Sequence, residues 1–169
     1  MNKLLIIFFT FFLFSCKEKS SKESLENDGD PVVNVESDDA AMNAAIAKAK
    51  GTFDGFIKTF KSQEENTRDY FVKMRFEGGA GEEAEAEHMW LGDLFFRGQD
   101  LFGILTSDPV FVKTHATGDT ILIQREKVSD WSYVRNNILV GGYTIRVLYN
   151  KMSAKERDEF KDMVDYTLE

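Results

Sequence analysis

SDWSYVRNNILVGGYTIRVLYNKM, residues 129–152, is the stretch around which the rest of the chain is organised. More densely than any other part of the sequence, it gathers an acid, a tryptophan, two glycines, a tyrosine and an arginine: Asp130, Trp131, Gly141, Gly142, Tyr143 and Arg146. Ser129 and Asp130 carry side chains typical of helix N-caps, which predicts a single helical turn that includes Trp131 and Val134. The dipeptide Asn136-Asn137 predicts a turn.

Residues 143–150 fit two patterns. Alternate residues are apolar, as in a strand, and a helical face is also present at Ile145, Leu148 and Met152. We predict a helix, because Ser153 and Glu156 form a capping box that starts a final helix directly afterwards. The residues expected to be buried on that final helix are Phe160, Met163 and Val164.

Arg146 is the one charged residue between Ile138 and Asn150. A buried guanidinium without a partner is too costly, so it must reach water, pair with a carboxylate or bind an anionic ligand. The nearest preceding acid is Asp130, across the turn and the glycine pair. We predict an Asp130–Arg146 ion pair that fixes the Trp131 turn, with anion binding by Arg146 as the alternative.

Upstream of this stretch, two helical patterns come first. Ser37 as N-cap predicts a helix over 38–50, and Gly51 is expected to end or bend it. Thr52 can cap a second helix over 53–61. The apolar stripe of that helix is Phe53, Phe56, Ile57 and Phe60.

Period-two alternation then predicts strands over 70–77, 88–96, 102–106 and 120–124, with a brief pairing of 110–112. Short strands joined by glycine turns favour antiparallel pairing. We therefore predict an α+β domain with N-terminal helices, a small curled antiparallel sheet or half-barrel, and C-terminal helices.

The N-terminus has the pattern of a secretory signal peptide over residues 1–15. Lys3 precedes the apolar run from Leu4 to Phe14, which as a helix rises only about 16 Å, half of a bilayer's hydrocarbon core. The run ends at Leu13-Phe14-Ser15-Cys16, which resembles the bacterial lipobox. This resemblance implies cleavage before Cys16 and lipid attachment, including palmitate-like acyl chains, at that cysteine. Simple secretory cleavage beside a stray cysteine is the alternative.

Residues 16–36 are polar and charged, so we predict a lipidated cysteine followed by a disordered tether. Residues 37–169 are enough for one domain. They hold 17 Lys and Arg against 23 Asp and Glu, a net charge of −6 that argues against a nucleic-acid partner. Cys16 is the only cysteine, so a lipidated chain has no disulfide and no thiol chemistry.

Four segments together resemble the bacterial family catalogued as domain of unknown function 2314, the YegJ-like proteins. They are SDDAAMNAAIAKAK, YFVKMRFE, EHMWLGD and SDWSYVRNNILVGGYTIRVLYNKMS, and the resemblance covers nearly all of residues 38–165. One departure is the Gly- and Glu-rich insert at 78–87, which looks longer than usual. The resemblance implies a compact α+β domain, often on envelope proteins, with no established activity or cofactor.

Candidate chemistry is sparse. The acidic residues that precede His88, namely Glu83, Glu85 and Glu87, are predicted to form a solvated loop, with a weak cation site as the alternative. Trp90, Trp131 and Tyr143 could line a ligand groove or could pack in the core. Together with Asp130 and Arg146 they are the candidate binding residues, and no catalytic or metal-binding residue is predicted.

Two functions follow as expectations. The first is an envelope lipoprotein with a non-enzymatic domain that binds a protein or small ligand. We expect it in the outer rather than the inner membrane, because Lys17 follows Cys16, where an aspartate would resemble the inner-membrane retention signal of bacterial lipoproteins. The alternative is a hydrolase-like enzyme that acts on an envelope polymer. A pocket with two facing carboxylates would favour the enzyme, and a flat aromatic patch would favour binding.

Overall fold

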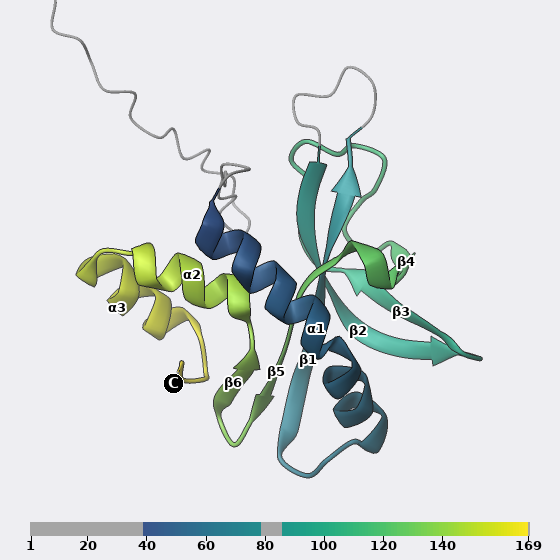
Figure 1. The fold of residues 1–169 in the computed structure, drawn as a ribbon, viewed down its shortest axis with the longest axis horizontal. Helices are drawn as coiled ribbons and strands as arrows, with labels where there is room; N and C mark the ends of the chain where they lie inside the picture. Colours follow the sequence, from purple (N-terminus) through teal and green to yellow (C-terminus); the bar gives the residue numbers. More distant parts are fainter. Residues whose placement is uncertain (1–38, 79–85, 169) are drawn as a thin grey trace, which may run out of the picture.

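In the computed structural model, one long helix lies across an antiparallel sheet, and two shorter helices lie beside the edge of that sheet (Figure 1). The structure describes residues 39–78 and 86–168. The signal peptide, Cys16, the tether at 16–36 and most of the acidic insert lie outside these residues. Within them the predicted α+β class is confirmed.

The first helix, α1 (Ala40–Ser62), is continuous. It begins at Asp39, whose carboxylate accepts hydrogen bonds from the amides of Ala41 and Met42, both at 3.1 Å. The predicted break at Gly51 is wrong. A glycine inside a helix costs only about 1 kcal/mol relative to alanine. That cost is offset here because the buried stripe continues with one period on both sides of the glycine: Met42, Ala45, Ala49, Phe53 and Phe56.

Six strands form the sheet in the order β4-β3-β2-β1-β5-β6, and every neighbouring pair is antiparallel. The sheet does not close into a barrel. The strands are β1 (Thr67–Glu77), β2 (Ala86–Arg97), β3 (Asp100–Leu105), β4 (Thr120–Leu122), β5 (Val128–Arg135) and β6 (Ile138–Gly141). The core lies between α1 and one face of this sheet, where Phe56, Val72, Leu91 and Leu105 are at most 1% exposed.

Residues 129–134 are part of β5 and not of a helical turn, so that prediction is wrong. Every residue from Val128 to Val134 is buried. Trp131 and Tyr133 turn toward α1, and β1 and β6 pair with the strand on either side. Burial of aromatic and β-branched side chains on a strand between two others outweighs the local helix-start signal of Ser129-Asp130.

After β5, the Asn136-Asn137 turn is confirmed, and both residues have positive φ, at 51° and 62°. The helix predicted over 143–150 is confirmed as α2 (Tyr143–Lys151). The capping box of Ser153 and Glu156 is confirmed at the start of α3 (Ala154–Met163). Met163, however, is 74% exposed, so the predicted buried face is wrong at this residue.

Glu87 organises the loop between β3 and β4. Its buried carboxylate accepts hydrogen bonds from the amides of Val110, Phe111 and Val112 at 3.0–3.2 Å, so the prediction of a solvated loop is wrong for Glu87. The predicted pairing of 110–112 as a strand is therefore wrong, because a carboxylate satisfies the amides that a neighbouring strand would have bound. A short 3-10 helix, η1 (Arg125–Lys127), then leads from β4 to β5.

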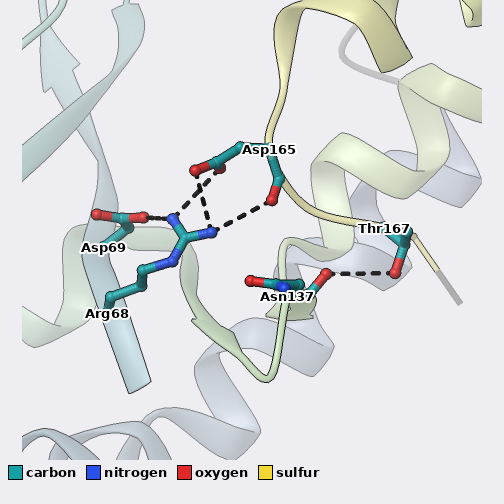
Figure 2. A network of polar contacts seen from close by, with 5 residues as sticks. All are labelled: Arg68, Asp69, Asn137, Asp165 and Thr167. Atoms are coloured by element: carbon teal, nitrogen blue, oxygen red, sulfur yellow. Dashed lines mark hydrogen bonds and ion pairs between the residues drawn. The ribbon is translucent and has the colours of Figure 1, made fainter. Parts of the chain in front are cut away.

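The C-terminal segment after α3 returns to the sheet (Figure 2). Thr167 pairs with the edge of β6: its amide donates to Asn137 O at 2.8 Å, and its carbonyl accepts from the amide of Leu139 at 3.0 Å. Arg68, on β1, lies 3.0 Å from a carboxylate oxygen of Asp165 and also bonds its carbonyl oxygen. These contacts cover the outer edge of β6, which would otherwise offer unpaired amides and carbonyls.

Candidate functional site

Asp130 lies at the junction of β5 and α2, where it caps that helix from a distance. The N-cap position of α2 is Gly142, which has no side chain to accept a hydrogen bond. The carboxylate of Asp130, 0% exposed, instead accepts from the amides of Tyr143 and Thr144 at 3.1 and 2.7 Å. It also accepts from the Thr144 hydroxyl at 2.6 Å and from its neighbouring Trp131 amide at 2.8 Å. A negative charge at a helix N-terminus is favourable, so the carboxylate of Asp130 stabilises the start of α2.

Trp131 lies on the other side of the same junction and ties α1 to it. Its indole N–H donates to the carbonyl of Ala49 in α1 at 3.0 Å, and the side chain is only 5% exposed. The ring of Tyr143 stands edge-on to it, with centroids 5.6 Å apart. The alternative of core packing is therefore confirmed for Trp131, while Tyr143 is partly buried against the same cluster.

Arg146 does not pair with Asp130, so that prediction is wrong. Its guanidinium donates to two carbonyls at the end of β6, Gly141 O at 3.1 Å and Leu139 O at 2.7 Å. The glycine pair turns α2 back toward β6, and this places the arginine beside the carbonyls of Leu139 and Gly141. The carboxylate of Asp130 instead accepts hydrogen bonds from backbone amides and from the Thr144 hydroxyl.

Trp90, the remaining candidate, lies on the opposite face of the sheet from α1. In β1, Val72, Met74 and Phe76 point into the core, so their alternate neighbours point to the other side. The register places Trp90 of β2 opposite Lys73 of β1, and Gly92 of β2 opposite Ile104 of β3. Phe102 of β3 lies opposite Phe95 of β2 on one side and Leu122 of β4 on the other. We call this surface the open face. Its residues are Phe71, Lys73 and Arg75 of β1, His88, Trp90, Gly92 and Phe95 of β2, Phe102 and Ile104 of β3, and Thr120 and Leu122 of β4.

Side chains of the open face contact one another and not the core. The rings of Phe71 and Trp90 lie 6.5 Å apart edge-to-face, and those of Phe95 and Phe102 stack at 5.8 Å. Apart from the buried Gly92, the apolar residues here are partly exposed, and Leu122 is 42% exposed. Gly92 has no side chain and leaves room for Phe71, since a Cβ there would lie 2.7 Å from that ring.

The charged groups that lie over these rings are cations. The ammonium of Lys73 is 5.4 Å from the centre of the Trp90 ring. The guanidinium of Arg97 is 5.2 Å from both Phe95 and Phe102. Arg75, at the end nearer the acidic insert, forms an ion pair with Glu77. The open face thus combines an aromatic surface with positive charge on a chain whose net charge is −8.

The structure also has two shallow clefts, and the second shares Arg75, Thr120 and Leu122 with the open face. One, of about 440 Å³, is lined by α2, α3 and the C-terminal segment, and its lining contains one acid, Asp165. The other, of about 390 Å³, lies between β1, β4 and η1, and its lining contains one acid, Glu77. Neither lining shows two facing carboxylates. In the described part of the chain, no three His, Cys, Asp or Glu side chains come together as metal ligands would.

Comparison with known proteins places this chain in a family. Residues 39–166 match the profile of DUF2314, whose members are described as uncharacterized proteins conserved in bacteria. The chain belongs to the DUF2314 family. The resemblance stated from the four sequence segments is therefore confirmed.

Two relatives of this DUF2314 protein share its domain. A putative ankyrin repeat protein of Neisseria meningitidis serogroup B is 32% identical over 137 residues, which cover 78% of this chain and 54% of that protein. The chain thus spans about half the length of that relative. The uncharacterized protein YegJ of Escherichia coli K12 is 30% identical over 132 residues, covering 78% of this chain and 82% of YegJ. No solved structure matches. Neither relative's name is that of an enzyme.

Sequence reasoning missed most of the open face of this DUF2314 domain. It selected Trp90 alone and did not select Phe71, Phe95, Phe102, Ile104 or Leu122. The missed signal is that 94–105 (LFFRGQDLFGIL) is apolar at both alternating positions of each strand. A strand apolar on both faces must either lie between two layers or present one apolar face to solvent or a partner.

Proposed function

We propose that this DUF2314 protein is a lipid-anchored protein of the bacterial envelope, in the outer rather than the inner membrane, whose domain binds a partner and catalyses no reaction. The observation that carries the binding part is the open face. It presents six large apolar side chains from four adjacent strands, and contiguous patches of this kind on folded domains mark interaction sites.

Composition of the open face supports a binding role. Tryptophan and arginine are enriched among the residues that dominate binding energies in protein interfaces, and both are present here as Trp90, Arg75 and Arg97. The other distinctive residues of the chain are used within the fold, Asp130 as a cap and Trp131 in the core. Among the candidate residues, Trp90 is the one that lies on the open face.

The anchoring part rests on the N-terminal sequence. The short apolar run and the Leu13–Cys16 motif support lipid attachment at Cys16. Two or more acyl chains are enough for stable anchoring. Within residues 39–78 and 86–168, no helix has the length and apolarity to cross a bilayer.

The relatives fit a binding role. In the Neisseria protein the same domain accounts for about half of a chain named for ankyrin repeats. Ankyrin arrays form extended concave surfaces that bind other molecules. A DUF2314 domain in such a chain is consistent with a role in recognition.

Lipid attachment is tested by metabolic labelling with an alkyne analogue of palmitate. The natural chain should carry the label and sediment with membranes, and Cys16→Ser should do neither. Label on the Cys16→Ser protein would show that the lipobox interpretation is wrong.

The binding role is tested by photo-crosslinking in cells. A benzophenone amino acid is placed at Phe102 on the open face and, as the matched control, at Glu159, which is exposed on α3. We expect a discrete adduct from position 102 and none from position 159. If neither position forms an adduct while both proteins are folded and membrane-bound, the binding role fails.

A further inference from the structure

We propose that the cleft between β4 and the end of β1 takes up an extended segment of another polypeptide, which pairs through its backbone with the outer edge of β4. The site is a strand edge and not the open face, so it goes beyond the binding role proposed for that face. Three features of the structure point to it.

The first feature is the outer edge of β4, the strand at one end of the sheet (Figure 1). The carbonyl of Asp119 and the amide of Ile123 both bond to β3, each at 2.9 Å. Because backbone groups alternate in direction along an antiparallel strand, the N–H and C=O groups of Thr120 and Leu122 point away from β3. Such an edge is a template for pairing with another chain.

The opposite edge of the sheet is covered by the chain itself. There, Thr167 bonds to the backbone of Asn137 and Leu139 beside β6. Within residues 39–78 and 86–168, no segment pairs in this way with the outer edge of β4. The two edges therefore differ, and the edge of β4 keeps backbone donors and acceptors for a partner.

The second feature is the end of β1, which lines the same cleft. The pairing of β1 with β5 ends where Met74 lies opposite Val128, whereas its pairing with β2 continues to Glu77 opposite Ala86. Among the described strands, residues 75–77 therefore have a partner on one side only. A segment placed in the cleft would have a strand edge on either side of it.

The third feature is the set of side chains that line the cleft. Met74 and Phe76 of β1 belong to the core, and Ile121 of β4 packs against it. Thr120 and Leu122, which lie on the open face, line the same cleft. Side chains alternate between the two faces along a strand, so a cleft that reaches both sets lies at the strand edges and not on one face.

The size of the cleft fits a short stretch of strand. A residue in a sheet takes up about 160 Å³, from a rise of ~3.4 Å, a strand spacing of ~4.8 Å and a sheet spacing of ~10 Å. The cleft of about 390 Å³ therefore holds roughly two to three residues, close to the three residues of β4. On its inner side the segment would lie against Phe76 and Ile121, so an apolar side chain fits there.

A lone segment fits this cleft better than a second copy of the chain. Pairing between two copies would join two β4 edges of three residues each and leave the end of β1 unpaired. A single extended segment has two free edges and can pair with both walls. Backbone pairing then gives affinity, and the inner side chain gives specificity.

The test uses the full chain, purified from membranes in neutral detergent, and a short peptide that alternates Thr and Val. Amide hydrogen exchange, followed by NMR, compares Leu122 with Ile123, whose amide is bonded to β3. In the free protein, Leu122 should exchange at least about tenfold faster than Ile123. With the peptide at millimolar concentration, exchange at Leu122 should slow by at least about threefold, and exchange at Ile123 should not change.

A control peptide has the same side chains but is methylated at each backbone nitrogen, so it cannot donate to a strand edge. It should leave exchange at Leu122 unchanged. No slowing with the first peptide, or equal slowing with the methylated one, overturns the inference. So does slow exchange at Leu122 in the free protein, which would mean that the edge is already covered.

Two variants separate the backbone of β4 from its side chain. Leu122→Pro removes the outward N–H, and proline is tolerated on edge strands. Leu122→Thr removes the apolar side chain and keeps the N–H. Peptide affinity, read from the shift of the Ile121 amide signal, should fall at least about fivefold in Leu122→Pro and less than about twofold in Leu122→Thr. Equal affinities of the two variants would contradict backbone pairing, and the methylated peptide decides the matter if Leu122→Pro does not fold.

The outcomes also separate this site from the open face. A shift of the Trp90 indole signal without slower exchange at Leu122 would place the peptide on the open face and overturn strand addition. Protection of Leu122 that rises with protein concentration in the absence of peptide would assign the edge to a second copy, with the same consequence. Absence of an adduct from position 102 in cells removes the binding role of the open face and leaves the edge of β4 as the binding site.

Discussion

Asp130 shows how a capping residue can serve a helix that starts well after it in the chain. Its side chain belongs to the class that begins helices, and it does cap a helix, but one that starts thirteen residues later at Tyr143. Glu87 acts in a similar way on the amides of 110–112. In both cases a buried acid satisfies backbone N–H groups that the local structure leaves unpaired.

Asp130→Asn should lower the free energy of unfolding by about 2–3 kcal/mol. The amide offers one oxygen where the carboxylate offers two, so an NH₂ group would face the amide of Thr144, a second donor. Asp158→Asn, exposed on α3, is the control and should change stability by less than about 0.5 kcal/mol. Urea unfolding measures both, and equal stability of Asp130→Asn and the parent would refute the capping role.

Gly141→Ala should cost more than about 3 kcal/mol, because strain and overlap add. Gly141 has a φ of +75°, and a Cβ there would lie 2.3 Å from the carbonyl oxygen of Trp131. Gly118→Ala separates the two effects: its φ is +93° but the space around it is open, so the expected loss is only about 1–2 kcal/mol. Similar losses for the two variants would mean that close packing on Trp131 contributes little.

At the scale of elements, α1 is the helix that covers the sheet, and it contains two glycines. Gly51 and Gly55 are helical, and a Cβ at either would meet nothing within 4 Å. Nothing in the packing requires glycine there. The helix persists because its apolar stripe is buried along its whole length.

Gly51→Ala should therefore raise the free energy of unfolding by about 0.5–1 kcal/mol. Gly98→Ala is the matched contrast, since its surroundings are also open but its φ is +63° in the turn between β2 and β3, and it should destabilise. Thermal unfolding followed by circular dichroism measures both. A loss of stability in Gly51→Ala would contradict a continuous α1.

At the scale of the whole molecule, an acidic protein concentrates positive charge beside one aromatic surface. Net charge alone argued against a nucleic-acid partner, but the fold places Lys73 and Arg97 over the rings of the open face. The net charge of the chain therefore does not reveal that two cations lie over these rings. A partner responds to the local charge at short range, because salt screens the rest beyond about 8–10 Å.

The pKa of His88 depends on burial and, after that, on the nearby cations Lys73, Arg75 and Lys50. The pKa of His88 is about 4, below the ordinary value of 6.5. Between pH 4 and pH 6.5, the unfolded state therefore binds a proton that the folded state does not bind. Stability should fall as the pH is lowered through this window, and His88→Gln should remove that part of the slope. Burial lowers the pKa of His88 most and the charge of Lys73 lowers it further, so Lys73→Gln should raise this pKa, as read by NMR titration of the imidazole. An unchanged pKa would show that Lys73 does not set the local charge.

Several features of this protein were determined by the sequence by itself, because they depend on neighbours along the chain. The family, the α+β class, the β2–β3 hairpin, the Asn136-Asn137 turn and the capping box of α3 are all of this kind. Periodicity and caps are local, and the tertiary structure confirmed them. Lipid attachment at Cys16 is likewise a local signal and stays a prediction.

Tertiary structure decided what each distinctive residue does. The sequence indicated Asp130, Trp131, Tyr143, Arg146 and Trp90 as one set, and the fold separates them. Asp130 and Arg146 bind different backbone groups, Trp131 and Tyr143 pack against α1, and Trp90 lies across the sheet among residues that no local pattern joins. Strand register and the position of α1 determine which side of the sheet is covered, and both depend on contacts between residues distant in sequence. The open face exists because α1 covers the other one.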